Sequence, residues 1–210
     1  MTGRERMIAA ASGLPTDIRA SVANDCQIVP VDRIRSAKGS NPDLLKLALV
    51  HSPLSRALRN NIAIYDLIQA DPATGNVKLD ELCLATQARA MDALGQGADG
   101  VCYLIEGASP KDSTPMQYGG HFLERDRELL ESFATAKFNL LVIADTVEPY
   151  IDFVSDLAAQ AFAWDSSSNW TVSQVRELRP GALATDLADA DIDFPRGALQ
   201  ALIQIQEANA

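Results

Sequence analysis

The sequence has few of the residues that hold metals, form disulfides or bind nucleic acid. Its 210 residues include two histidines and three cysteines, Cys26, Cys83 and Cys102. The cysteines are widely spaced and form no Cys-x-x-Cys pair, which argues against a disulfide framework and a cysteine-based zinc site. Lys and Arg number 18 against 28 Asp and Glu, for a net charge of −10. Because phosphate binding needs clustered cations, this balance argues against a nucleic-acid partner.

Long apolar runs are also missing. No stretch reaches eighteen apolar residues, so no membrane span is expected. Arg4 and Arg6 near the N-terminus are not followed by the apolar core of a signal peptide. Together with the unpaired cysteines, this indicates a cytoplasmic protein. The length predicts a single domain over residues 1–210, and the apolar content of 47% is normal for a chain with a buried core.

The first half of the chain predicts a mixture of helices and strands. A capping box at Thr2 and Glu5 predicts a helix over about 3–12. Further segments are a strand at 26–31, an apolar run at 44–51 that fits either strand or helix, a short helix at 53–60, a strand at 62–68 and a turn at 71–76.

From Leu79 onward, helices alternate with short apolar strands. The first helix spans 79–94 and is expected to bury Leu84, Ala88, Met91 and Leu94 on one face. The later helices are expected at 122–133, 151–161, after the capping box at Thr171, and at 199–207, with strands at 101–105, 140–143, before Asp165 and before Asp186. Such alternation implies parallel strands joined by right-handed crossovers.

An ordered series of motifs accompanies this pattern. A Gly97-Ala98-Asp99-Gly100 step precedes the strand 101–105, and a small polar turn, 106–109, follows it. The series continues with Tyr118, Phe122, Arg127, Leu129 and Leu130, then Trp164-Asp165, and is extended by 1–10 and 171–187. This series resembles the uroporphyrinogen decarboxylase superfamily, which joins tetrapyrrole decarboxylases to cobalamin-linked methyltransferases. The resemblance covers about residues 1–15 and 85–190.

The resemblance implies a TIM-barrel-like (β/α) fold. A complete barrel takes about 250 residues, so a shortened or incomplete one is expected. Two family features are absent. There is no arginine-rich N-terminal motif for gripping carboxylates, and Ala144-Asp145-Thr146 stands where the methyltransferase branch carries a zinc-binding His-x-Cys pair.

Acidic residues follow four of the expected strands. Ligands of parallel α/β folds bind where strands end, so the carboxylates are candidates for catalytic acid–base work, although each could instead cap the next helix. These candidates are Glu106, Asp145, Asp165 and Asp186. The substrate-binding candidates are Tyr103, His121, His51 and Arg56, the last with Arg59 as a second guanidinium for bidentate carboxylate binding. No metal and no cofactor are expected.

Three functions remain open from the sequence. The first is a uroporphyrinogen decarboxylase-like carboxy-lyase in porphyrin biosynthesis, with one of the aspartates stabilising a protonated pyrrole. The second is a corrinoid-linked methyltransferase-like protein. The third is a degenerate barrel that binds a tetrapyrrole, a corrinoid or a partner protein without catalysis. A small tetrapyrrole- or corrinoid-related substrate is expected in each enzymatic case, and a homodimer is one expected assembly.

Overall fold

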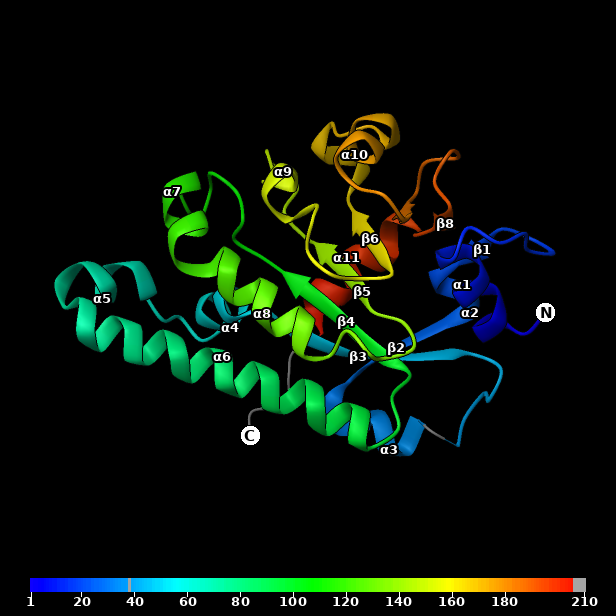
Figure 1. Cartoon of the computed structure of the whole chain (residues 1–210), viewed down its shortest axis with the longest axis horizontal. Helices are drawn as coiled ribbons and strands as arrows, with labels where there is room; N and C mark the ends of the chain where they lie inside the picture. Colours follow the sequence, from blue (N-terminus) through cyan, green and yellow to red (C-terminus); the bar gives the residue numbers. More distant parts are fainter. Residues whose placement is uncertain (38, 206–210) are drawn as a thin grey trace.

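The computed structural model describes residues 1–37 and 39–205 and shows an α/β fold built on one parallel sheet (Figure 1). The sheet order is β1-β8-β7-β6-β5-β4-β3-β2, and every pairing is parallel. The strands are β1 Ala20–Ser21, β2 Cys26–Pro30, β3 Leu45–His51, β4 Gly100–Ile105, β5 Leu140–Ile143, β6 Ala161–Trp164, β7 Ala182–Thr185 and β8 Ile192–Asp193. The predicted α/β class with parallel strands is confirmed.

The sheet curls into an incomplete barrel. Its two edge strands, β1 and β2, are joined by a single helical turn, α2 Val22–Asp25, so the edges lie close together. Within the described residues, β1 and β2 do not pair with each other. The expected shortened barrel is therefore confirmed, and its opening lies at this seam.

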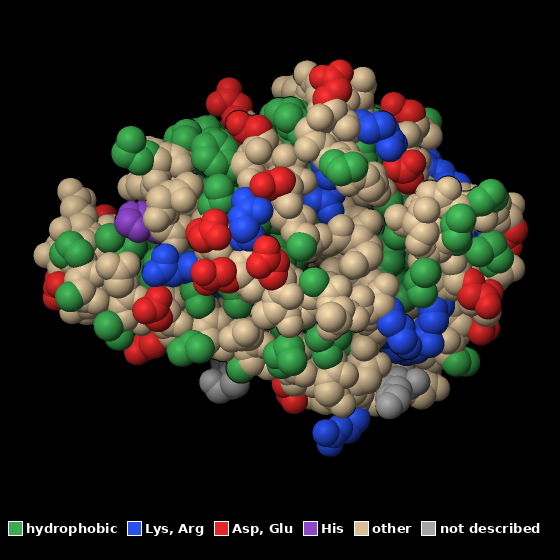
Figure 2. Space-filling view, viewed as in Figure 1, with side chains coloured by type: hydrophobic (Ala, Val, Ile, Leu, Met, Phe, Trp, Pro, Cys, Tyr) green, Lys and Arg blue, Asp and Glu red, His purple; other side chains and the backbone are tan. Residues whose placement is uncertain are grey.

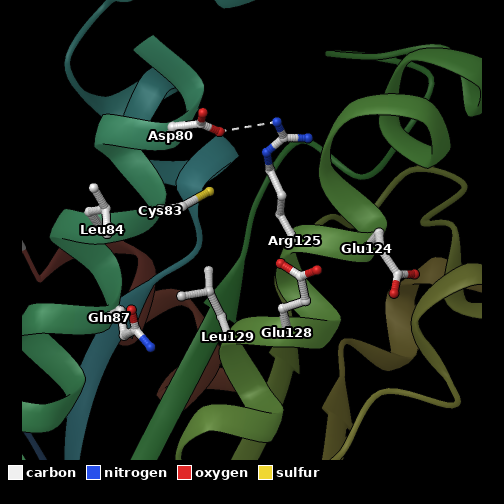
Figure 3. Close-up of a pocket in the computed structure, with 8 residues that line it drawn as sticks. All are labelled: Asp80, Cys83, Leu84, Gln87, Glu124, Arg125, Glu128 and Leu129. Atoms are coloured by element: carbon white, nitrogen blue, oxygen red, sulfur yellow. Dashed lines mark hydrogen bonds and ion pairs between the residues drawn. The ribbon is translucent and has the colours of Figure 1, made fainter. Parts of the chain in front are cut away.

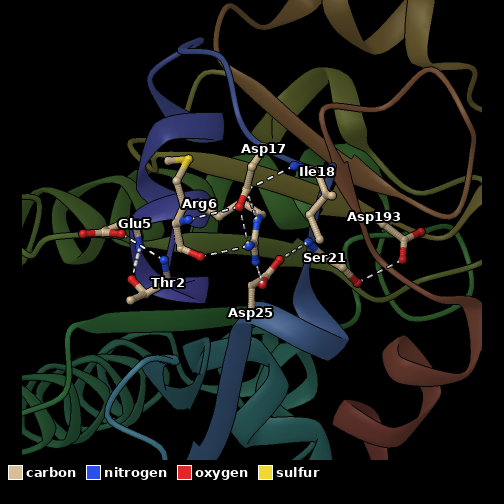
Figure 4. Close-up of polar contacts among 9 residues, drawn as sticks. Thr2, Glu5, Arg6, Asp17, Ile18, Ser21, Asp25 and Asp193 are labelled. Carbon is tan, nitrogen blue, oxygen red and sulfur yellow. Dashed lines mark hydrogen bonds and ion pairs between the residues drawn. The ribbon is translucent and has the colours of Figure 1, made fainter.

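A polar network closes the seam where a strand ladder is missing (Figure 4). Arg6 of α1 Gly3–Ala11 is 9% exposed and donates to Asp17 at 2.7 Å and to Asp25. Asp25 accepts from the Ser21 backbone N–H at 2.9 Å, and the Ser21 hydroxyl bonds Asp193 of β8 at 3.0 Å. Charge-assisted hydrogen bonds of this kind are stronger than neutral ones, so the network ties α1 and α2 to the edge strand.

Alternate residues of each strand enter two different cores. In β3, Leu45, Leu47 and Leu49 pack on one face, whereas Ala48 and Val50 pack on the other. The first face is the concave inside of the barrel and also receives apolar residues of α1, α2 and α11. The second is the outer face, covered by α4, α5, α6, α8, α9 and α10. Burial on both faces explains why the strands are continuous apolar runs.

The helices that complete the fold follow the strands in order. Besides α1 and α2 they are η1 Val31–Arg33, α3 Ile34–Ala37, α4 Pro53–Arg59, α5 Ile64–Ala70, α6 Pro72–Gly95, α7 Pro115–Tyr118, the π-helical turn η2 Gly119–Leu123, α8 Glu124–Ser132, α9 Ile151–Val154, η3 Ser166–Ser168, α10 Val172–Leu178 and α11 Arg196–Gln204. Among the described helices, none combines the length and apolarity that crossing a membrane requires.

Two expectations around α5 and α6 were wrong. The predicted strand at 62–68 is helix α5, because Ile64 and Ile68, four residues apart, are buried in the core that α6 shares. The predicted turn at 71–76 is the start of α6, where Asp71 accepts from the backbone N–H groups of Ala73 and Thr74 at 3.1 and 3.4 Å. An N-cap aspartate followed by proline stabilises the first turn of a helix.

The buried face of α6 also differs from the prediction. Leu84 and Met91, which were expected inside, are 65% and 50% exposed. The buried positions are Gly75, Leu79, Leu82, Thr86, Ala90 and Ala93, which repeat at intervals of three and four. The helix is therefore rotated relative to the predicted face.

Two later boundaries shift as well. The helix expected over 151–161 ends at Val154, and Ala161 begins β6 instead. Arg179 stabilises the irregular link between them by donating to the carbonyls of Ser155, Leu157 and Ala159 at 2.6–2.8 Å. The closing helix expected at 199–207 is α11, Arg196–Gln204, and Glu207 lies outside the described residues.

Candidate functional site at the carboxyl end of the barrel

Three acidic residues continue the concave face of the barrel beyond the strand ends. Glu106 follows inward-facing Leu104, Asp165 follows Ala163, and Asp186 follows Ala184, each at a spacing of two. His51, at the end of β3, continues the inward series of Leu45, Leu47 and Leu49. We call the three carboxylates and His51 the mouth residues. Four of the predicted site residues therefore lie at the carboxyl ends of their strands, at positions in line with the residues that face the inside of the barrel.

Helix α11 lies across this mouth. Its Leu199 and Leu202 are 2% and 5% exposed and pack in the concave core. Its polar residues reach the mouth residues: Arg196 Nε donates to Asp186 at 2.9 Å, and Gln200 Nε2 donates to Asp165 at 2.8 Å. In Figure 1, α11 is the red helix that passes behind β4 and β5.

Arg59, at the end of α4, joins Glu106 to the end of α11. Its Nε donates to Glu106 Oε2 at 2.5 Å and its second nitrogen donates to Oε1 at 3.1 Å, a bidentate ion pair. The same guanidinium donates to the carbonyls of Ile203 and Ile205 at 2.5 and 3.5 Å. Arg59 therefore holds both the mouth carboxylate Glu106 and the end of α11. It was predicted to bind a substrate carboxylate, and in the structure the carboxylate that it binds belongs to the protein itself.

Hydrogen bonding keeps the two mouth aspartates in place. Asp165 also accepts from the Ser167 backbone N–H at 2.9 Å, so it caps η3 as well as binding Gln200. Burial disfavours the charged form of Asp186, but hydrogen bonds from Ser166 and Arg196 outweigh it, so its pKa lies below the ordinary value. An anionic Asp186 is suited to binding a cationic group or accepting a hydrogen bond.

Asp145 takes a different position. It follows Ile143, which faces the outer core, and it accepts from the Gly107 N–H at 3.0 Å and the Ser109 hydroxyl at 3.1 Å. Burial raises its pKa, and those two hydrogen bonds oppose the rise. In this structure Asp145 therefore holds the loop after β4.

The remaining predicted residues are spread over the molecule. Tyr103 faces the outer core, where its hydroxyl donates to buried Asp126 at 2.5 Å. His121 lies on η2, with its ring 6.4 Å from the ring of Tyr65. Arg56 lies on α4, one turn before Arg59. The structure thus brings together the mouth residues and Arg59, while Tyr103 and His121 lie elsewhere.

A hollow lies between the loop after β5 and the segment after β6. The loops after β5 and β6 enclose a space of about 420 Å³ whose lining includes Glu148, Asn169, Trp170 and Gln174. Glu148 and Asn169 both have left-handed backbones, with φ of 46° and 68°. Strained conformations of this kind cluster at functional sites. The Trp164 Nε1–H···O=C bond to Trp170, at 3.1 Å, fixes this loop to β6.

A second hollow lies on the outside of the barrel between α6 and α8 (Figure 3). It measures about 510 Å³, and an Asp80–Arg125 ion pair of 3.2 Å crosses it. Burial raises the pKa of Cys83, which lines it, to about 12. A thiol of that pKa stays protonated near neutrality, so this groove offers no thiolate nucleophile.

Neither the search for a metal site nor the distribution of surface charge gives a candidate site stronger than the mouth. Among the described residues, no group of three or more His, Cys, Asp or Glu side chains is arranged to hold a metal ion. Figure 2 shows acidic and basic side chains interspersed on one face of the molecule. The mouth is therefore the candidate site.

Comparison with known proteins adds a fold relationship. The sequence matches no protein-family model and no curated protein. The structure is similar to a methyltransferase from Methanosarcina mazei, with a TM-score of 0.70 over 88% of this chain and 82% of that chain. The two share a fold. Because their sequence identity is 12%, the likeness shows the fold alone.

Proposed function

We propose that this chain is a methyltransferase-like protein of the uroporphyrinogen decarboxylase superfamily that binds a methylated, cationic small molecule at the carboxyl end of its barrel. The observation that carries the proposal is the convergence of Glu106, Asp165 and Asp186 at the mouth. The fold shared with a methyltransferase supports it. A tetrapyrrole decarboxylase gains less support, since carboxylates at the mouth repel the carboxylates of such a substrate.

The hollow between the segments after β5 and β6 fits the same ligand class. Trp170 is among its lining residues, and the face of an indole ring attracts methylated ammonium groups. Glu148 and the nearby Asp165 supply negative charge. In methyl transfer from such a ligand, the C–N bond breaks, nitrogen keeps the electron pair, and a nucleophile supplied by the second substrate forms the new bond to carbon. The carboxylates bind and orient the cation before that step.

Titration calorimetry with tetramethylammonium and trimethylamine, beside ammonium, tests the binding. We expect the methylated cations to bind more tightly than ammonium, Asp165→Asn to weaken them about tenfold and Trp170→Leu to weaken them several-fold. Glu177→Gln changes an exposed acid on α10 and is the matched control. Equal affinity for ammonium and tetramethylammonium, or no effect of Asp165→Asn, would contradict the proposal.

A non-catalytic binding protein is the second candidate, and α11 favours it. The mouth residues already bond Arg59, Arg196 and Gln200, so a ligand has to displace them. Incubation of the protein with a bound methylated amine and a reduced corrinoid, with methylcorrinoid read by absorbance, separates the two candidates. Binding with transfer supports the methyltransferase, and binding without transfer supports the second candidate.

A further inference from the structure

A cavity of about 390 Å³ lies at the opposite, amino-terminal end of the barrel. It is formed by the start of α1, the start of β3 and the segments before β4 and β5, with Arg4, Lys46, Gly97, Asp99 and Lys137 in its lining. The Gly97-Ala98-Asp99-Gly100 step, singled out in the sequence, contributes its first three residues to the lining. The mouth chemistry uses none of these residues.

The cavity has an excess of positive charge. Asp99, 5% exposed, is its one lining carboxylate, and it pairs with Arg4 at 2.9 Å and Lys137 at 3.3 Å. The third cation, Lys46, is 2% exposed, and its Nζ donates to the carbonyl of Asn41 at 3.0 Å. Among the described residues that line the cavity, three cations and one carboxylate leave a local charge of +2, in a chain whose net charge is −10.

Arg4 has hydrogen-bonding capacity to spare. Its Nε is buried, and no described residue accepts a hydrogen bond from it. A buried donor left unpaired is unfavourable, so an acceptor that enters the cavity gains a bond that the protein alone does not make. The Nη2 atom of Arg4 already forms an ion pair with Asp99, and this pair fixes the position of the guanidinium.

The backbone of the glycine step is not available for binding. The N–H groups of Gly97, Ala98 and Asp99 donate to the carbonyls of Leu94, Ala93 and Lys46. A ligand is therefore recognised by side chains and not by a loop of free amides. Gly97, which lines the cavity, has a φ of 100°, a backbone conformation that glycine adopts readily.

We propose that this cavity binds the phosphate group of a small phosphorylated molecule. A phosphate monoester carries close to two negative charges at pH 7 and three acceptor oxygens. That charge balances the local +2, and the oxygens match the donors on Arg4, Lys46 and Lys137. The cavity is separate from the mouth, so the proposal does not depend on the function proposed above.

Titration calorimetry with inorganic phosphate and glycerol phosphate, at ionic strength matched with potassium chloride, tests the site. We expect saturable binding that Lys137→Gln weakens about tenfold and Lys137→Arg largely restores. Lys137 is 64% exposed, so its replacement leaves the core intact. Lys111→Gln, which changes an exposed lysine outside the cavity, is expected to have no effect.

The dependence on pH gives a second readout. Below about pH 6 phosphate loses its second charge, so its binding to the cavity is expected to weaken as the pH falls through that value. The proposal is overturned if chloride competes as well as phosphate does, or if Lys137→Gln and Lys111→Gln bind phosphate equally. Binding of inorganic phosphate but not of glycerol phosphate would also contradict a phosphorylated small molecule as the ligand.

Discussion

Replacing Leu199 and Leu202 together with alanine is expected to release α11 from the mouth while the barrel stays folded. Both leucines are almost fully buried in the concave core, at 2% and 5% exposure. A buried Leu→Ala change destabilises by about 2–5 kcal/mol. Two such changes cost at least about 4 kcal/mol together, and if that loss falls on the docking of α11 the open population rises about a thousandfold. Hydrogen exchange of 196–204, read by mass spectrometry, measures this change.

Exchange of strand β4 and of a control variant shows whether α11 opens by itself or together with the barrel. Exchange of β4, residues 100–105, is expected to change much less than that of α11, because β4 is buried between two neighbouring strands. Ala201→Ser alters an exposed position of the same helix and is the control. Equal acceleration in α11 and β4 would show that α11 opens only with the whole barrel, and the mouth would then have no separate open state.

The same variant connects packing to ligand access. The bonds from Arg196 and Gln200 to Asp186 and Asp165 are made only while α11 is seated. A ligand that uses these carboxylates therefore competes with α11, and its apparent affinity is its affinity for the open protein multiplied by the fraction of open protein. We expect the double variant to bind tetramethylammonium more tightly than the wild type does. Weaker binding would show that α11 contributes to the binding surface.

The strands β4 to β7 could be predicted because each is a short apolar run with turns at both ends, whereas β8, only two residues long, was not predicted. The first half was harder, since Ile62, Ile64, Leu67 and Ile68 fit a strand and a helix equally well in isolation. Packing of α5 against α6 decides the outcome, and that contact is not visible in a local pattern. The face of α6 was misjudged for the same reason: the residues opposite it determine which apolar positions are buried.

The mouth was predictable in part. The rule that ligands bind at strand ends grouped Glu106, Asp145, Asp165 and Asp186 as candidates. In the structure, three of them share the inward register with His51, whereas Asp145 follows the outward-facing Ile143. The rule did not foresee that α11 covers the mouth, because Arg196 and Gln200 reach the mouth through tertiary packing. Asp126 was also missed within the charged run Glu124–Glu128, although it stands four residues from both Phe122 and Leu130, on the apolar face of α8.

Asp126 makes the stability of this protein depend on pH in an unusual direction. It is fully buried and accepts hydrogen bonds from the hydroxyls of Tyr103 at 2.5 Å and Tyr118 at 2.9 Å. Burial raises its pKa from an ordinary 3.8 to about 7, and the two tyrosine bonds oppose the rise. The folded state therefore holds a proton that the unfolded state releases. The contribution of Asp126 is most favourable below about pH 4 and is lost as the pH rises to about 7.

Asp126→Asn is expected to remove this dependence. Asparagine keeps the shape and can bond both tyrosines, but it has no charge to bury. The two proteins should be about equally stable near pH 4, and the variant should gain about 1.4 kcal/mol per pH unit over wild type, reaching about 4 kcal/mol by pH 8. Urea unfolding at intervals from pH 4 to 8 measures the difference, with exposed Glu131→Gln as the control.

A second variant, Tyr118→Phe, separates the contribution of burial to the pKa of Asp126 from that of hydrogen bonding. Tyr118→Phe removes one of the two bonds that stabilise the carboxylate, so it should raise the pKa of Asp126 further and move the loss of stability to higher pH. A difference between wild type and Asp126→Asn that stays flat from pH 4 to 8 would mean that water or a nearby cation reaches the carboxylate. Because Asp126 joins β4 to α7 and α8 through the two tyrosines, such access would require the helical layer over β4 to open near neutral pH.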